Sequence, residues 1–184
     1  MSTPEGSTGS SSPFGGVQTL LAEWLGTLML LATVVGSGIM GQRLAAGNDG
    51  IALLANTLAT ACALVVLIEL LGPVSGAHFN PVVTWVLAIR EQRSKVTAVG
   101  YTVAQLLGAV MGTWLAHAMF DLALVQTSAT ARTGTGQWIS EGVATFGLVL
   151  AILLTVRHRP DMVAVVVGLY ITSAYWFTSS TSFA

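Results

Sequence analysis

Six stretches of this chain are almost entirely apolar, and short polar segments separate them. Five of the stretches have about the length of a helix that crosses a bilayer core of about 30 Å. These predicted spans cover about residues 17–40, 51–71, 97–119, 138–156 and 162–177. The sixth stretch runs only from Pro81 to about Ile89. A helix of about ten residues is roughly 15 Å long and is too short to cross.

The segment before this short stretch, residues 72–80, is Gly-Pro-Val-Ser-Gly-Ala-His-Phe-Asn. Its glycines, together with Pro73 and Pro81, predict a break in the helix. Asn80 followed by Pro81 favours a new helix start, because Asn caps free N–H groups and Pro suits the first helical position. We therefore predict a re-entrant loop followed by a half-helix that begins within the membrane.

Composition supports an all-α integral membrane protein. Hydrophobic residues make up 53% of the chain and charged residues 8%, whereas about 25% is usual in soluble domains. The net charge of −1 provides no basic surface for nucleic acid. We expect no metal and no cofactor. The single Cys62 lies within an apolar span, where we expect a buried and inert thiol.

Two boundaries and an orientation follow from the polar segments. Residues 1–16, rich in Ser, Gly and Thr, are predicted to be a disordered tail, and residues 17–184 a single transmembrane domain. Basic residues favour a cytoplasmic N-terminus in the plasma (inner) membrane, because cytoplasmic loops carry the excess of Lys and Arg. With that orientation the inner turns hold Arg90, Arg93, Lys95, Arg157 and Arg159, and the outer loops hold Arg43 and Arg132.

The spans show a weak internal repeat. Glu23 precedes Thr27 by four residues in the first span, and Glu141 precedes Thr145 by four in the fourth. This spacing divides the chain into repeat one, residues 17–119, and repeat two, residues 138–184. Three spans in each half would place the halves in opposite orientations, as in many transport folds.

Carboxylates within a membrane need partners, because a charge at mid-bilayer costs at least about 2.5 kcal/mol. We expect Glu23 and Glu141 to accept hydrogen bonds from N–H groups of re-entrant segments, although both could instead reach the interface. Glu69 and His117, near span ends, are expected at the interface. Gly108 and Gly112 have the spacing that lets two helices approach closely.

Asn80 is the candidate functional residue. Its carboxamide would lie at mid-membrane, at the positive end of the half-helix dipole. It could donate a hydrogen bond to a neutral molecule while the dipole opposes cations. An ordinary N-cap on an interfacial helix remains the alternative interpretation.

The residues from Ser75 to Thr84, Ser-Gly-Ala-His-Phe-Asn-Pro-Val-Val-Thr, resemble the first pore loop of the aquaporin (major intrinsic protein) family. His78, Asn80 and Pro81 match that signature, and Val82 replaces its usual alanine. Glu23 and Glu141 resemble the family's first-span and fourth-span glutamates. The resemblance implies a passive channel for water or small uncharged solutes, in homotetramers, with no enzymatic activity.

The resemblance also implies where the pore narrows. Counting without gaps places Thr60 at the second-span constriction position, Ser173 at the fifth-span position and Ser182 at the loop position. Thr60 and Ser173 are smaller than the aromatic and histidine that water-specific members have at the first two positions, which implies a wider pore that also admits glycerol, urea-like solutes or metalloid hydroxides. Each of them could equally be a Ser or Thr that packs between helices.

The family's second Asn-Pro-Ala loop, selectivity arginine and sixth span would follow Ala184. We therefore expect a truncated or partial sequence, with five spans and one half-helix.

Three alternatives to a channel stay open on sequence alone. An ion- or proton-coupled transporter also uses broken helices, but it would need a titratable pair in its cavity. An intramembrane hydrolase would need a nucleophile and base, and the sequence lacks Gly-x-Ser-x-Gly. A truncated chain could also be a non-conducting subunit.

Overall fold

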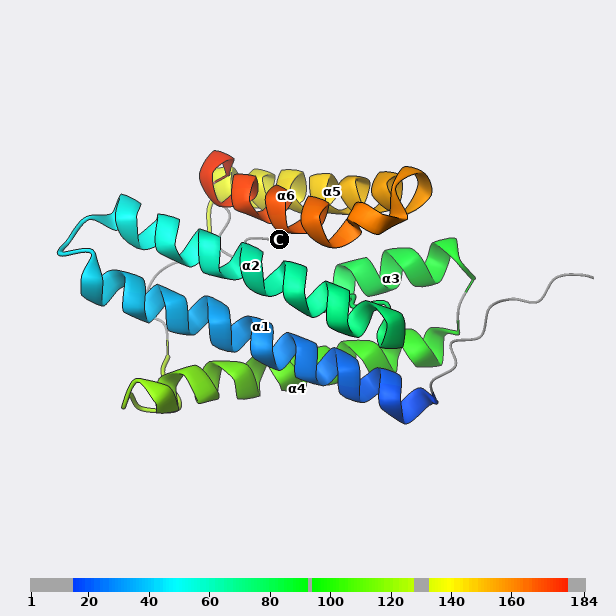
Figure 1. Cartoon of the computed structure of the whole chain (residues 1–184), viewed down its shortest axis with the longest axis horizontal. Coiled ribbons are helices and arrows are strands. Elements are labelled where there is room, and N and C mark those ends of the chain that lie inside the picture. The colour runs from blue at the N-terminus through cyan, green and yellow to red at the C-terminus, as the bar shows by residue number, and fades with distance from the viewer. Residues whose placement is uncertain (1–14, 93, 128–132, 179–184) are drawn as a thin grey trace, which may run out of the picture.

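The computed structural model describes residues 15–92, 94–127 and 133–178, and the regular elements of this part are all helical. Figure 1 shows these helices side by side along the long axis of the molecule. They are α1 (Gly16–Leu44), α2 (Asp49–Ser75), α3 (Pro81–Arg90), α4 (Lys95–Met119), α5 (Thr135–His158), a short 3-10 helix η1 (Pro160–Met162) and α6 (Val163–Phe177).

Five of these helices are long and apolar enough to cross a membrane, and they confirm the predicted spans. Helix α1 packs against α2 and α4, while α6 packs against α2 and α5. The fifth candidate span joins η1 to α6, from Pro160 to Phe177. The half-helix α3 occupies only one end of the molecule (Figure 1).

The break after α2 comes later than predicted. We expected the helix to stop near Leu71, but it continues through Gly72 and Pro73 to Ser75. It ends at Gly76, whose φ of +91° is the left-handed conformation that glycine adopts without strain. The N–H of Gly76 then donates to the carbonyl of Gly72. The sequence therefore predicted a break in the right segment, but the helix ends about one turn later than expected.

Close packing of α1 and α4 depends on two glycines. A Cβ at Gly108 would collide with the carbonyl oxygen of Trp24, and one at Gly112 with that of Leu28. The Gly108–Gly112 spacing thus lets the two backbones touch, as predicted. Gly142, by contrast, has nothing within 4 Å of such a Cβ in the described structure.

The prediction for Cys62 was wrong. Its side chain is exposed on the outside of α2 rather than buried among other helices. Many leucines and valines of the spanning helices are exposed in the same way, including Leu58 and Val66 of α2. A membrane helix shows its apolar side chains to lipid or to another subunit, so an apolar neighbourhood in the sequence does not identify an inward-facing residue.

The two helix turns that carry the basic residues lie at the same end of the molecule. The turn between α3 and α4 and the turn between α5 and α6 both lie at the right in Figure 1. Arg90, Lys95, Arg157 and Arg159 belong to this end, while Arg43 lies near the opposite end of α1. Arg93 and Arg132 lie outside the described residues.

Candidate pore

The loop between α2 and α3 has an unusual backbone. Gly76, Ala77 and Phe79 have φ values of +91°, +49° and +47°. Residues other than glycine adopt this region at a cost of about 1–3 kcal/mol each, so they need support from their surroundings. The loop is short and lies within a candidate membrane protein, where its N–H groups require internal partners.

Glu23 of α1 supplies those partners. Its side chain is 0% exposed. Oε1 accepts hydrogen bonds from the Ser75 hydroxyl at 2.6 Å and from the His78 N–H at 3.0 Å. Oε2 accepts one from the Phe79 N–H at 2.8 Å. The structure therefore agrees with the expectation that Glu23 holds a re-entrant segment, and not with the alternative that it reaches the interface.

Two residues of α4 complete this polar network, and neither was predicted from the sequence. The Gln105 amide donates to Glu23 Oε2 at 2.8 Å and to the Thr84 hydroxyl at 2.9 Å. The Tyr101 hydroxyl donates to the Ser75 carbonyl at 2.9 Å. Gln105 is 1% exposed, although it lies in an apolar span. A glutamine inside a predicted apolar span is the sequence feature that could have identified Gln105 as a candidate.

The Phe79 ring provides a second contact between the loop and α1. It occupies the space where a Cβ of Gly26 would lie. Gly26 lies three residues after Glu23, and its lack of a side chain makes room for the Phe79 ring. Phe79 is 7% exposed, so its apolar surface is almost completely buried.

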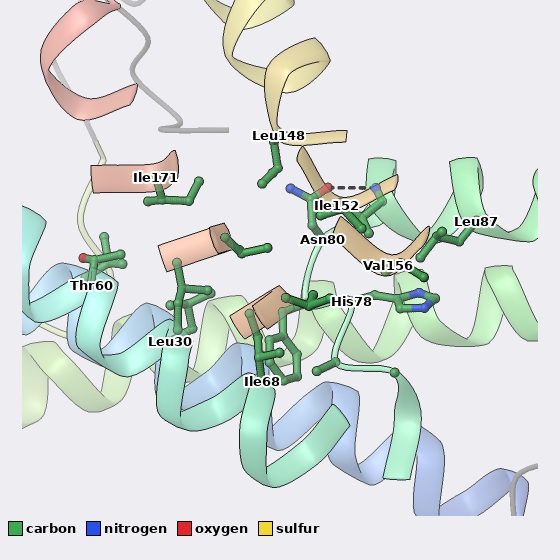
Figure 2. Close-up of a pocket in the computed structure, with 18 of the residues that line it drawn as sticks. Leu30, Thr60, Ile68, His78, Asn80, Leu87, Leu148, Ile152, Val156 and Ile171 are labelled. Atoms are coloured by element: carbon green, nitrogen blue, oxygen red, sulfur yellow. Dashed lines mark hydrogen bonds between the residues drawn. The ribbon is translucent and has the colours of Figure 1, made fainter. Parts of the chain in front are cut away.

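Asn80 caps α3 as predicted. Its side-chain oxygen accepts from the N–H groups of Val82 at 2.8 Å and Val83 at 3.3 Å, and Pro81 opens the helix. Figure 2 shows the amide nitrogen on the side away from this capping bond. Val82 is 46% exposed, which explains why a residue larger than alanine fits here without disturbing the cap.

His78 lies between the loop and α3. Its Nδ1 is 3.1 Å from the Thr84 hydroxyl, and its ring meets the Tyr101 ring edge-on at 5.3 Å. Thr84 thereby contacts both His78 and Gln105. The histidine is thus part of the structure that supports the loop as well as part of the cavity wall.

A cavity of about 280 Å³ adjoins this loop. In Figure 2, His78 and Thr60 lie at opposite sides of the view, with Asn80 between them. The remaining wall is mostly aliphatic and includes Leu64, Ile68, Leu148, Ile152, Val167 and Ile171. Asn80 therefore presents a polar group to a largely apolar cavity.

The three proposed constriction residues have different outcomes. Thr60 lines the cavity, is 3% exposed and lies 3.3 Å from the Tyr175 hydroxyl. Ser173 does not line the cavity, is exposed and donates to the Tyr170 carbonyl at 2.8 Å. Tyr175, two residues later, lines the cavity instead, because two residues along a helix rotate the side chain to a different face. Ser182 lies outside the described residues.

Glu141 is half-buried on α5. We expected it to accept hydrogen bonds from the N–H groups of a re-entrant segment. This role, the counterpart in repeat two of the role of Glu23 in repeat one, stays a prediction.

Comparison with known proteins identifies the family. A profile of the major intrinsic protein family matches residues 10–182. The chain belongs to the major intrinsic protein family. It is thus an integral membrane protein of the aquaporin-like all-α fold.

Individual relatives support the same assignment. The chain is 55% identical to the aquaglyceroporin AqpS of Rhizobium meliloti over 164 residues, covering 89% of this chain and 70% of the relative. It is 34% identical to aquaporin TIP2-1 of Zea mays over 153 residues, covering 82% and 61%. It is 33% identical to the lens fiber major intrinsic protein of Gallus gallus over 169 residues, covering 87% and 63%. The match thus spans less than two thirds of the last two relatives.

Proposed function

We propose that this protein is a passive channel for water and small uncharged solutes, with glycerol as the test solute. The observation that carries the proposal is Asn80, held at the N-terminus of α3 beside a largely apolar cavity. Its relatives are named aquaporins and an aquaglyceroporin, which supports the same class of activity. Passage through such a channel needs neither a cofactor nor covalent chemistry.

The site favours neutral molecules over cations for an electrostatic reason. The N-terminus of α3 carries the positive end of its dipole, equivalent to about half an elementary charge. Aliphatic walls provide few ligands to replace the hydration shell of an ion, and dehydrating a charge is costly. A neutral solute loses less hydration free energy on entry. The Asn80 amide can form a hydrogen bond that replaces one that the solute made with water.

The size of the cavity wall residues supports solutes larger than water. Thr60 is small for a constriction position, and leucine, isoleucine and valine side chains suit the carbon backbone of a polyol. We therefore propose glycerol, urea-like solutes and metalloid hydroxides as candidates beside water, with Thr60, Asn80 and His78 in the solute path.

The setting of the channel is also part of the proposal. Basic residues gathered at one end of the molecule favour a cytoplasmic location for that end and for the N-terminus. We propose the plasma (inner) membrane as its location and a homotetramer as its assembly, with a pore in each protomer. Exposed apolar side chains on the outer helix surfaces suit contact with both lipid and neighbouring protomers.

A flux experiment separates this proposal from a coupled transporter. The full-length protein is reconstituted into proteoliposomes, and glycerol entry is followed by light scattering with and without an imposed proton or sodium gradient. A channel predicts glycerol entry that depends only on the glycerol gradient. Glycerol accumulation that follows the ion gradient would show coupled transport and overturn the proposal.

A further inference from the structure

Two hydroxyl groups from different helices meet at the side of the cavity opposite His78. Thr60 Oγ1 of α2 and Tyr175 Oη of α6 lie 3.3 Å apart, and either hydroxyl can donate. Thr60 is 3% exposed and Tyr175 is 4% exposed, so both side chains are almost completely enclosed. Both line the same cavity as Asn80, in a wall that is otherwise largely aliphatic.

The contact between α2 and α6 explains why Tyr175 reaches this place. A Cβ at Gly168 would lie 2.9 Å from Val65 Cγ2 and 3.1 Å from the Ala61 carbonyl oxygen, so the glycine lets α6 approach α2 closely. Ile171 and Tyr175 follow Gly168 by three and seven residues, which is the spacing of one helix face. The two helices run in opposite directions in Figure 1, so the residues after Gly168 advance toward Thr60.

From this arrangement we infer that Tyr175 is a specificity-determining residue of the channel, and that it acts together with Thr60. The inference rests on the proposed function. The phenol ring limits the width of the passage at Thr60. Its hydroxyl and the Thr60 hydroxyl form a hydrogen-bonding pair that a solute with several hydroxyl groups can replace with bonds of its own.

The chemistry of polyols makes this pair useful. Each solute hydroxyl that enters an aliphatic passage loses hydrogen bonds to water, which costs free energy unless a new partner is available. Asn80 is one such partner, and the Thr60–Tyr175 pair provides a second at a different position along the cavity. A molecule with three hydroxyls gains more from two separated sites than a water molecule does. The ratio of glycerol to water permeability should therefore depend on Tyr175.

The test compares two substitutions with a matched tyrosine on the same helix. Tyr175→Phe keeps the ring but removes the hydroxyl, and Tyr175→Val removes the ring. The control is Tyr170→Phe, because the Tyr170 hydroxyl donates to the Ala144 carbonyl at 2.9 Å and its side chain does not line the cavity. Water, glycerol and a larger polyol, xylitol, are measured on proteoliposomes of the full-length protein and on protein-free vesicles.

We expect Tyr175→Phe to lower the glycerol-to-water permeability ratio about 2- to 10-fold, the range that corresponds to one neutral hydrogen bond. Tyr175→Val is expected to raise the xylitol-to-water ratio above that of the wild type. Tyr170→Phe is expected to leave both ratios unchanged. Because these are ratios within one preparation, a lower yield of folded variant does not change them.

The inference is overturned if the wild type conducts glycerol and Tyr175→Phe keeps its glycerol-to-water ratio. It is also overturned if Tyr170→Phe shifts that ratio as much as Tyr175→Phe does. Wild-type vesicles no more permeable to water or glycerol than protein-free vesicles would instead overturn the proposed function, and this inference with it.

Discussion

At the scale of single residues, the carboxylate of Glu23 determines the shape of the pore loop. It accepts four hydrogen bonds from described residues, which fills the capacity of about four for an ionised carboxylate. Two of these bonds come from backbone N–H groups of the loop, beside residues with strained positive φ values. The buried carboxylate and the strained loop therefore stabilise each other.

Replacing Glu23 by Gln should destabilise the protein and abolish conduction. One oxygen becomes an NH2 group that faces other donors, and a buried donor without a partner costs about 1–3 kcal/mol. Each carboxylate oxygen accepts from two donors, so we expect the free energy of unfolding to fall by about 2–6 kcal/mol. Thermal unfolding in detergent and vesicle swelling measure the two effects.

Glu69→Gln is the control, because Glu69 is exposed near the end of α2. Equal melting temperatures for the two variants would contradict this role of Glu23.

Asn80→Asp should weaken the exclusion of cations. The aspartate can still cap α3, but its negative charge offsets the positive end of the helix dipole beside the cavity. We expect a higher sodium or proton leak in vesicles, while water permeability remains. Asn48→Asp is a matched control, because Asn48 caps α2 and does not line the cavity. A leak that increases equally in both variants, or in neither, would argue against the dipole as the barrier.

Some of these residues could be identified from the sequence and others could not. Glu23 and Asn80 stand out because a charge in an apolar span and an Asn-Pro helix start are local signals. Tyr175 does not, because its position at the cavity depends on how α6 crosses α2, and the ungapped count selected Ser173 instead. Gln105 lies between these cases, since its polarity is visible but its partners are distant in the sequence.

At the scale of elements, glycines set the distances between helices. Gly108 and Gly112 bring α4 against the backbone of α1, which places Gln105 within reach of Glu23. Gly26 of α1 makes room for the Phe79 ring, and Gly168 lets α6 approach α2 closely. The sequence predicted the long helices and the half-helix, because hydrophobic length and the Asn80–Pro81 start are strong signals. It misplaced the end of α2, because Gly72 and Pro73 were expected to break the helix, whereas α2 continues through both and ends at Gly76 in a left-handed conformation.

Gly108→Ala should loosen the α1–α4 interface. The new methyl group would collide with the Trp24 carbonyl oxygen, which is backbone and cannot rotate away. Overpacking of this kind typically costs about 1–3 kcal/mol. Thermal unfolding of Gly108→Ala is compared with that of Gly142→Ala, where a Cβ meets nothing within 4 Å in the described structure. We expect a lower melting temperature only for Gly108→Ala, and a Gly108 variant as stable as the wild type would disprove the close contact.

At the scale of the whole molecule, the described residues form one half-helix that begins beside a cavity and five helices that can cross a membrane. The five helices alternate in direction, so the α3–α4 and α5–α6 turns lie at the end opposite the α1–α2 connection and the last turn of α4 (Figure 1). This arrangement follows from the number and length of the spans. The cavity itself could not be predicted, because its wall combines side chains from helices that are far apart in the sequence.

Cysteine labelling tests the orientation of the molecule. In a Cys62→Ser background, Glu91→Cys lies in the α3–α4 turn and Leu124→Cys in the α4–α5 connection. With a cytoplasmic N-terminus, a membrane-impermeant maleimide added to intact cells should label only Leu124→Cys. Both cysteines should react once the cells are opened. Labelling of Glu91→Cys in intact cells would reverse the orientation.

The central claim is that Asn80 and its cavity pass neutral molecules and exclude ions. The most direct measurement records glycerol entry and proton leak in the same proteoliposomes of the full-length protein, by light scattering and a trapped pH-sensitive dye. We predict that glycerol enters faster than in protein-free vesicles, while the proton leak equals theirs. A proton leak that increases with the amount of protein, or glycerol entry no faster than in protein-free vesicles, would contradict the claim.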